Sequence, residues 1–278
     1  MKHLYDELSL SCSMSTTKKY STSFSLGTRA LNSQFRGPVH SIYGFVRLAD
    51  EIVDSFHGFE QRELLKKFEA DTWDAIEHKI SLNPILNSFQ KVYSEFGFEK
   101  HLVEAFLKSM AFDLDKTAYS EGEYSEYIFG SAEAVGLMCL RVFVRGDDRI
   151  YANLKPYAQA LGSAFQKVNF LRDIQADFEV LGRTYFPNAM LSDFSSQDKI
   201  EIEADIQRDF EIAKEGISML PKEARFGVFV AYQYYLRLFK QIQKTPAEEI
   251  RSKRIRVPNG KKYSLFFTSY LQHRLNRF

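Results

Sequence analysis

Cysteine, tryptophan and proline are scarce in this chain of 278 residues, which contains two cysteines, one tryptophan and seven prolines. Cys12 and Cys139 lie far apart and have no metal-ligand spacing, so a zinc site built on thiolates is excluded. Two distant cysteines are typical of reduced thiols in a cytoplasmic protein. The few prolines leave long uninterrupted segments in which helices can form.

The sequence also lacks a long apolar run and an excess of charge of either sign. No stretch approaches the roughly 20 apolar residues of a membrane-spanning helix, and the N-terminus has no charged region followed by an apolar run and a cleavage site. We therefore expect a cytoplasmic protein that is soluble, or at most peripheral at the inner membrane surface. The 37 basic and 36 acidic residues give a net charge of +1, which argues against a nucleic-acid partner.

Apolar residues recur with a helical period, and the prolines fall where helices would start or stop. No alternating run with turn signals indicates a sheet. The chain shows no internal repeat, low-complexity tract or linker, so we predict an all-α protein with one domain over residues 1–278. The longest expected helical segments are 39–57, 60–80, 99–118, 123–145, 156–180, 197–218 and 222–244.

Two of these segments carry a polar stripe that ends in paired aspartates. The first stripe consists of Tyr43, Arg47, Asp50 and Asp54, and the second of Gln166, Asn169, Asp173 and Asp177. Spacings of three and four residues place each set on a single helix face. Like charges so close together destabilise a helix unless a cation lies between them. Oxygen ligands without Cys or His favour Mg²⁺, with Mn²⁺ as an alternative, and point to diphosphate chemistry.

The second stripe is the more informative, because the rest of its helix is apolar. A polar ladder inside a buried helix costs several kcal/mol unless each group has a partner. Metal ions and a phosphate ligand would satisfy it. The alternative, an ordinary charged surface, explains one aspartate pair well. It explains two pairs poorly, since each is in register with amide or guanidinium groups.

An ordered set of motifs resembles the squalene/phytoene synthase family over nearly the whole chain. The matching segments are Tyr20–Phe24, R-x-x-D-[DE]-x-x-D at 47–54, Y-x-x-x-x-A-x-x-V-G-x-M at 127–138, Q-x-x-N-x-x-R-D-x-x-x-D at 166–177, G-R-x-Y-x-P at 182–187, Tyr235 and the basic stretch 254–262. A single D-x-x-x-D match is common by chance, whereas this order is specific. Glu133 stands where many relatives have glycine, so it either faces outward or adds a carboxylate near the cavity.

The resemblance implies an isoprenoid-synthase helical bundle around a central cavity, with the two aspartate helices facing each other at its mouth. The implied metal ligands are Asp50, Asp54, Asn169, Asp173 and Asp177. The implied substrate-binding residues are Ser23, Phe24, Tyr43, Arg47, Gln166, Asn169, Arg172, Tyr235 and Arg254. The catalytic set comprises the four aspartates and Tyr127, a cavity aromatic to which we also assign proton handling. Aromatic faces suit a dry cavity that holds carbocations.

The implied reaction is head-to-head (1′-1) condensation of two geranylgeranyl diphosphates to phytoene through a cyclopropyl diphosphate, in carotenoid biosynthesis. The alternative is a squalene or dehydrosqualene synthase that acts on farnesyl diphosphate, with NADPH in the reductive case. A third reading, a non-catalytic assembly factor of the same fold, is disfavoured because all four aspartates are present. A di-iron carboxylate bundle is excluded, since no histidine follows a glutamate at the required spacing. Oily substrates and products suggest peripheral membrane association and hand-off to a downstream desaturase.

Overall fold

The computed structural model describes residues 1–187, 194–250 and 255, and the backbone in these residues is helical apart from short connections and one isolated bridge between Ala118 and Thr184. The predicted all-α fold is therefore confirmed. In the first half of the chain the helices are α1 (Lys2–Tyr20), α2 (Thr22–Ala30), α3 (Ser33–Asp54), α4 (Gln61–His78), α5 (Pro84–Phe96) and α6 (Lys100–Asp115). They are followed by α7 (Glu121–Ile128), the π-helix η1 (Phe129–Glu133), α8 (Ala134–Phe143), α9 (Asp148–Leu181), α10 (Ser196–Met219), α11 (Lys222–Gln243) and α12 (Ala247–Ile250).

Local sequence signals set several helix ends. Asn83 caps α5 by accepting hydrogen bonds from the two backbone amides beyond Pro84, and Gly97 ends that helix at a φ of 65°. Ser120 and Glu123 form a capping box at the start of α7. Two prolines contradict the prediction that prolines mark helix ends, because Pro38 lies inside α3 and Pro156 inside α9. Each removes one backbone hydrogen bond, a cost that the packing of these long helices offsets.

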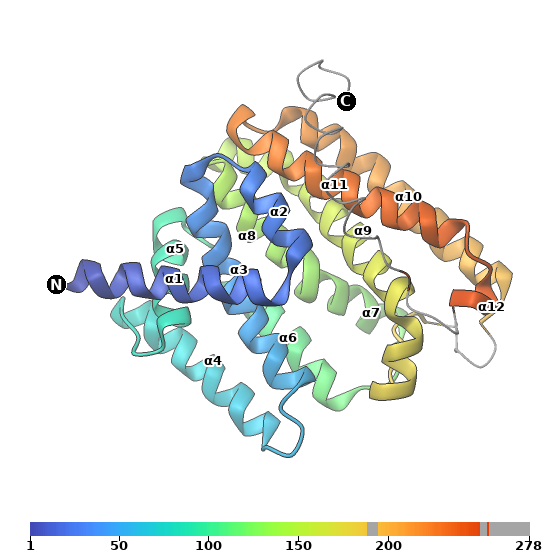
Figure 1. Cartoon of the computed structure of the whole chain (residues 1–278), viewed down its shortest axis with the longest axis horizontal. Helices are drawn as coiled ribbons and strands as arrows, with labels where there is room; N and C mark the ends of the chain where they lie inside the picture. The colour runs from blue at the N-terminus through green and yellow to red at the C-terminus, as the bar shows by residue number, and fades with distance from the viewer. Residues whose placement is uncertain (188–193, 251–254, 256–278) are drawn as a thin grey trace.

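The buried side chains form two clusters. The first cluster includes residues of α3, α4, α5, α6 and α8, and it surrounds fully buried rings such as Phe45 and Phe89. The second cluster includes residues of α7, α9, α10, α11 and α12, among them Phe210 and Phe239. In Figure 1, α9 runs between the α7–α8 segment and the α10–α11 pair, and α3 lies on the far side of α8. The candidate site occupies the space between the two clusters.

The central motif at 127–138 forms an interrupted helix. Helices α7, η1 and α8 are continuous, and the π turn covers Phe129–Glu133. Gly130 allows this turn to approach α6, since an added Cβ would lie 2.3 Å from the carbonyl oxygen of Ala105. Gly162 likewise allows α9 to approach η1, since an added Cβ would lie 2.9 Å from the carbonyl oxygen of Ala132. π turns are rare and occur often beside functional sites.

Candidate active site

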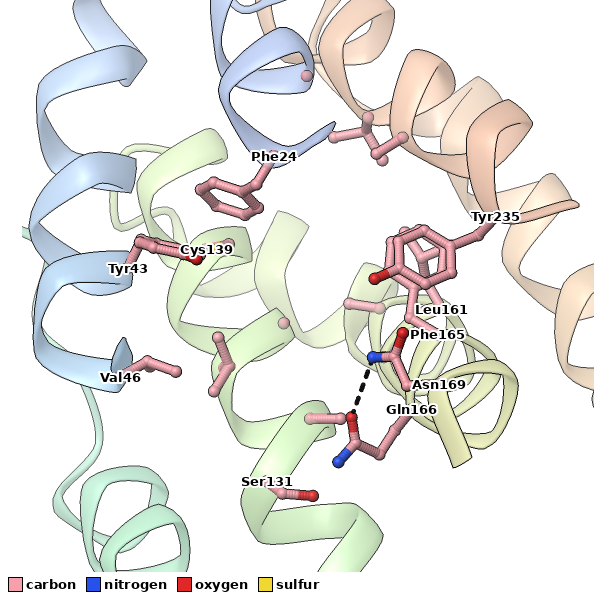
Figure 2. Close-up of a pocket in the computed structure, with 18 of the residues that line it drawn as sticks. Phe24, Tyr43, Val46, Ser131, Cys139, Leu161, Phe165, Gln166, Asn169 and Tyr235 are labelled. Carbon is pink, nitrogen blue, oxygen red and sulfur yellow. Dashed lines mark hydrogen bonds between the residues drawn. The ribbon is translucent and has the colours of Figure 1, made fainter. Parts of the chain in front are cut away.

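A cavity of about 840 Å³ lies between α2, α3, α8, α9, α10 and α11. Its wall contains every predicted site residue whose side chain is described. These are Phe24, Tyr43, Arg47, Asp50, Asp54, Tyr127, Gln166, Asn169, Arg172, Asp173, Asp177 and Tyr235. Figure 2 shows residues of α2 and α3 facing residues of α9 and α11 across the cavity. Ser23 lies in α2 but its side chain is not among those described, and Arg254 lies outside the described residues.

The first stripe lies on the cavity side of α3. The guanidinium of Arg47 donates to the carboxylates of Asp50 and Glu51, one turn further along the helix. Its Nε atom is buried and has no hydrogen-bond partner in the described part of the chain. The ring of Tyr20 lies 4.3 Å from the guanidinium carbon. Arg47 is thus held at the cavity wall with one donor unused, which suits an anion.

The second stripe faces it from α9. Arg172 donates to the carboxylate of the neighbouring Asp173, with Nε 3.0 Å from Oδ1. Asn169 donates from Nδ2 to the amide oxygen of Gln166 at 3.4 Å (Figure 2). Of the three arginines predicted to bind diphosphate, Arg47 and Arg172 therefore each pair with a predicted metal ligand.

Burial perturbs the aspartates of both stripes. Loss of solvation, and then the nearby charge of Asp54, raises the pKa of Asp50. Loss of solvation and the charge of Asp173 raise the pKa of Asp177 to about 7. Both carboxylates are thus short of positive charge in their surroundings. A divalent cation would relieve this deficit.

The donor set fits a hard cation. Among the described residues, no three Asp, Glu, His or Cys side chains form a ready-made metal cluster. The oxygen Oδ1 of Asn169 is nevertheless buried beside the aspartates without a hydrogen-bond partner in this part of the protein. A buried acceptor without a partner costs free energy, and a metal ion or a metal-bound water would satisfy it. The chemistry of these side chains therefore suits a hard cation such as Mg²⁺, which Asp50, Asp54, Asn169, Asp173 and Asp177 would hold.

Tyr127 contributes to the cavity wall but its hydroxyl is already engaged. It is 3% exposed, and its phenol oxygen lies 3.0 and 2.9 Å from the two carboxylate oxygens of Asp113. Burial raises the pKa of the phenol well above its ordinary value. The hydroxyl is therefore a hydrogen-bond donor to Asp113 rather than a source of phenolate.

Aromatic rings line the apolar walls on both sides of the cavity. Phe24 stacks on Tyr43 with ring centroids 4.5 Å apart, and Phe165 stacks on Tyr235 at 3.9 Å. Phe165 was not among the predicted residues, although its position one residue before the second stripe places it near the same helix face. Stacked rings present π faces suited to carbocations.

Three further residues near the aspartates lie outside the predicted set of site residues. Asp113 lines the cavity from α6, and its carboxylate contacts Arg183 and Tyr185. Burial raises the pKa of Asp113 to about 7. The G-R-x-Y-x-P motif at 182–187 signalled Arg183 and Tyr185, whereas a lone aspartate in α6 carried no pattern.

Glu133 does not supply an additional carboxylate to the cavity wall. It lies at the end of η1, half-buried, and its Oε2 accepts a hydrogen bond from Nε2 of Gln159 at 2.8 Å. Its neighbour Ala132 lines the cavity instead. The substitution of glycine by glutamate is therefore accommodated between η1 and α9.

Known proteins share this arrangement of motifs and helices. The squalene/phytoene synthase family model matches residues 17–261. The chain belongs to the squalene/phytoene synthase family. It is 25% identical to a 4,4'-diapophytoene synthase of Staphylococcus haemolyticus, over 90% of this chain and 92% of that protein. It is 32% identical to a presqualene diphosphate synthase of Sinorhizobium fredii over 66% of this chain and 65% of that one, and 26% identical to a phytoene synthase of Rhodobacter capsulatus over 90% and 77%.

Solved structures of this squalene/phytoene synthase fold superpose closely. A dehydrosqualene synthase in complex with ligand has a TM-score of 0.82 at 21% identity and covers 98% of both chains. A squalene synthase from Alicyclobacillus acidocaldarius has a TM-score of 0.76 at 19% identity and covers 87% of this chain and 95% of its own. The predicted isoprenoid-synthase fold is thus confirmed. The family consists of head-to-head prenyltransferases that act on prenyl diphosphates.

Proposed function

We propose that this protein condenses two molecules of geranylgeranyl diphosphate head to head into phytoene, in a Mg²⁺-dependent reaction of carotenoid biosynthesis. One observation carries the proposal: two aspartate stripes on α3 and α9 meet at one end of a cavity whose other walls are apolar and aromatic. Diphosphate groups suit the polar end, and hydrocarbon chains suit the remainder.

The residues divide into two tasks. Mg²⁺ bound by the aspartates and Asn169 would neutralise the leaving diphosphate. Arg47 and Arg172 would orient the diphosphates by paired hydrogen bonds. Gln166 would orient Asn169, to which it is hydrogen-bonded. The stacked pairs Phe24–Tyr43 and Phe165–Tyr235 would exclude water and face the developing positive charge.

The reaction then follows in two ionisations. The C1–O bond of one substrate breaks, diphosphate leaves with the electron pair, and an allyl cation remains in the cavity. The double bond of the second substrate attacks this cation, and loss of a proton gives a cyclopropyl diphosphate. A second C–O cleavage releases the other diphosphate, and rearrangement followed by loss of a proton yields the 1′-1 linked product.

The reach of the cavity along α9 is long enough for the longer substrate. Asp173 and Leu154 both line it, and the segment between them spans about 28 Å at a rise of about 1.5 Å per residue. An extended geranylgeranyl chain needs roughly 20 Å and a farnesyl chain roughly 15 Å, since four backbone bonds per isoprene unit span about 5 Å. Farnesyl diphosphate remains the alternative substrate, because the Staphylococcus haemolyticus relative is a 4,4'-diapophytoene synthase.

Product analysis tests the proposal directly. The purified protein is incubated with Mg²⁺ and either farnesyl or geranylgeranyl diphosphate, with and without NADPH, and the hydrocarbons are extracted and identified. We expect a C40 hydrocarbon whose formation needs Mg²⁺ and not NADPH. A C30 product would favour the farnesyl alternative, and a product formed only with NADPH would favour squalene. No hydrocarbon from either substrate would contradict enzymatic function.

We also propose peripheral membrane association and delivery of product to a desaturase, because substrate and product are both oily. No helix in the described part of the chain has the length and apolar composition needed to cross a membrane. Flotation with liposomes, in the presence and absence of substrate, measures the association. Absence of the protein from the lipid fraction in both cases would contradict it.

A further inference from the structure

Arg183 is in contact with the ends of three helices that carry the candidate site. Its side chain is 7% exposed, and Nη1 lies 3.3 Å from Oδ1 of Asp54, at the end of α3. The same nitrogen lies 3.3 Å from Oδ1 of Asp113, and Nη2 donates to the backbone carbonyl of Asp113 at 2.6 Å. Its backbone amide donates to the carbonyl of Asp177 at 2.9 Å. One residue thus joins the final aspartate of each stripe to α6.

The backbone around Arg183 fixes this position. Gly182 has a φ of 64°, which reverses the chain after α9 and returns the amide of Arg183 to Asp177. The next residue, Thr184, donates its amide to the carbonyl of Thr117 at 2.8 Å. The segment is therefore attached on both sides, and the direction of the Arg183 side chain follows from it.

Arg183 supplies the positive charge that faces two carboxylates, those of Asp54 and Asp113. Asp54 and Asp113 both face Arg183, whereas Arg47 pairs with Asp50 and Arg172 with Asp173. Within the described residues, Arg183 is therefore the cation that Asp54 and Asp113 share. A planar fork can donate to a carboxylate and to a backbone carbonyl in fixed directions, while a lysine ammonium is a single point charge on a flexible stem.

We infer that Arg183 is a positioning residue, which holds the two aspartate stripes at the separation that lets them bind one metal–diphosphate cluster. The inference rests on the proposed function, because it assumes that both stripes bind the same cluster. It predicts that metal binding, and not only chain stability, depends on the forked geometry of this side chain.

Isothermal titration with Mn²⁺ in the presence of inorganic diphosphate tests the inference without turnover. We expect Arg183→Lys to lose at least about tenfold in affinity, since charge alone does not replace the two-directional contacts. Arg62→Lys is the matched control, because Arg62 forms an exposed ion pair with Asp115 away from the cavity wall. Its affinity should stay within about twofold of the wild type.

A chemical rescue separates positioning from folding. Arg183→Ala should regain binding in the presence of millimolar methylguanidinium, whereas the affinity of Arg62→Ala should not change. Helical content by circular dichroism is measured for each sample. Wild-type affinity in Arg183→Lys, or absence of rescue in Arg183→Ala, would overturn the inference. Absence of Mn²⁺–diphosphate binding by the wild type would instead overturn the proposed function on which it rests.

Discussion

The phenol of Tyr127 shares its proton between the two carboxylate oxygens of Asp113, at 3.0 and 2.9 Å. Both side chains are buried at the cavity wall, and both lie outside the two aspartate stripes. A carboxylate buried this deeply depends on its hydrogen-bond donors, because it has lost its hydration. Tyr127 therefore supports Asp113, and through it the contacts made by Arg183.

Tyr127→Phe removes one of these donors from Asp113. We expect the free energy of unfolding to fall by about 1–3 kcal/mol, the usual cost of leaving a buried acceptor unsatisfied. Chemical denaturation measures the change. Tyr124→Phe is the control on the same helix, since Tyr124 packs through its ring against Phe170 and Phe186, and phenylalanine keeps these contacts. An equal fall in the free energy of unfolding in both variants would mean that the hydrogen bond from Tyr127 to Asp113 adds no stability.

The elevated pKa of Asp113 predicts how stability depends on pH in the presence of a chelator. Burial raises its pKa to about 7, above the ordinary value of 3.8 that applies in the unfolded chain. Between these values the folded protein binds more protons than the unfolded one, so stability declines as the pH rises from about 4 through 7. The contribution of Asp113 reaches at most about 4 kcal/mol, since one pKa unit corresponds to about 1.4 kcal/mol.

Unfolding in guanidinium chloride at pH 5 and pH 8, with EDTA, measures this effect. We expect Asp113→Asn to be less sensitive to pH than the wild type, because it removes one titrating carboxyl. Asp71→Asn is the control, as Asp71 is partly exposed and pairs with Lys67 on the surface of α4. Stability that rises with pH to the same extent in all three proteins would contradict the prediction.

How much the sequence predicts depends on whether the signal is local. The two stripes were predictable because spacings of three and four residues fix a helix face. The long-range contacts of Arg183 with Asp54 and Asp113 join segments that are far apart in the chain, and no spacing encodes them. The G-R-x-Y-x-P match drew attention to Arg183 without giving its partners.

Helix ends show the same limit. Proline at position 84 begins α5, as its missing amide hydrogen predicts. Pro38 and Pro156 lie inside helices because burial of the apolar faces of α3 and α9 outweighs one lost hydrogen bond. The local penalty was visible in the sequence, whereas the packing that offsets it was not.

Gly216 is predicted to be intolerant of any side chain. An added Cβ would lie 2.2 Å from Cβ of Tyr157, so α10 and α9 are in direct contact there. We expect Gly216→Ala to destabilise the protein by about 1–3 kcal/mol, the usual cost of overpacking. Because Tyr157 also lines the cavity, its displacement should lower affinity for the longer substrate more than for the shorter one.

Gly122→Ala provides the matched control in α7, where nothing lies within 4 Å of an added Cβ. This change should be neutral or stabilise the protein by up to about 1 kcal/mol, since alanine is the better helix former. Thermal unfolding compares the two variants. Equal stability of both would show that α10 can move away from Tyr157 without cost.

The aspartates of the two stripes should be essential for turnover. Asp50→Ala and Asp173→Ala should each lower turnover by at least about a hundredfold, which corresponds to roughly 3 kcal/mol of lost leaving-group stabilisation. Helical content should be nearly unchanged, because both side chains line the cavity and belong to neither cluster of packed apolar side chains. Asp74→Ala, an exposed aspartate on α4, should retain the wild-type rate. The rates are measured as hydrocarbon formed from prenyl diphosphate with saturating Mg²⁺. Full activity in either cavity variant would show that the metal ligands have been wrongly assigned, because a carboxylate that binds the metal cannot be removed without lowering the rate.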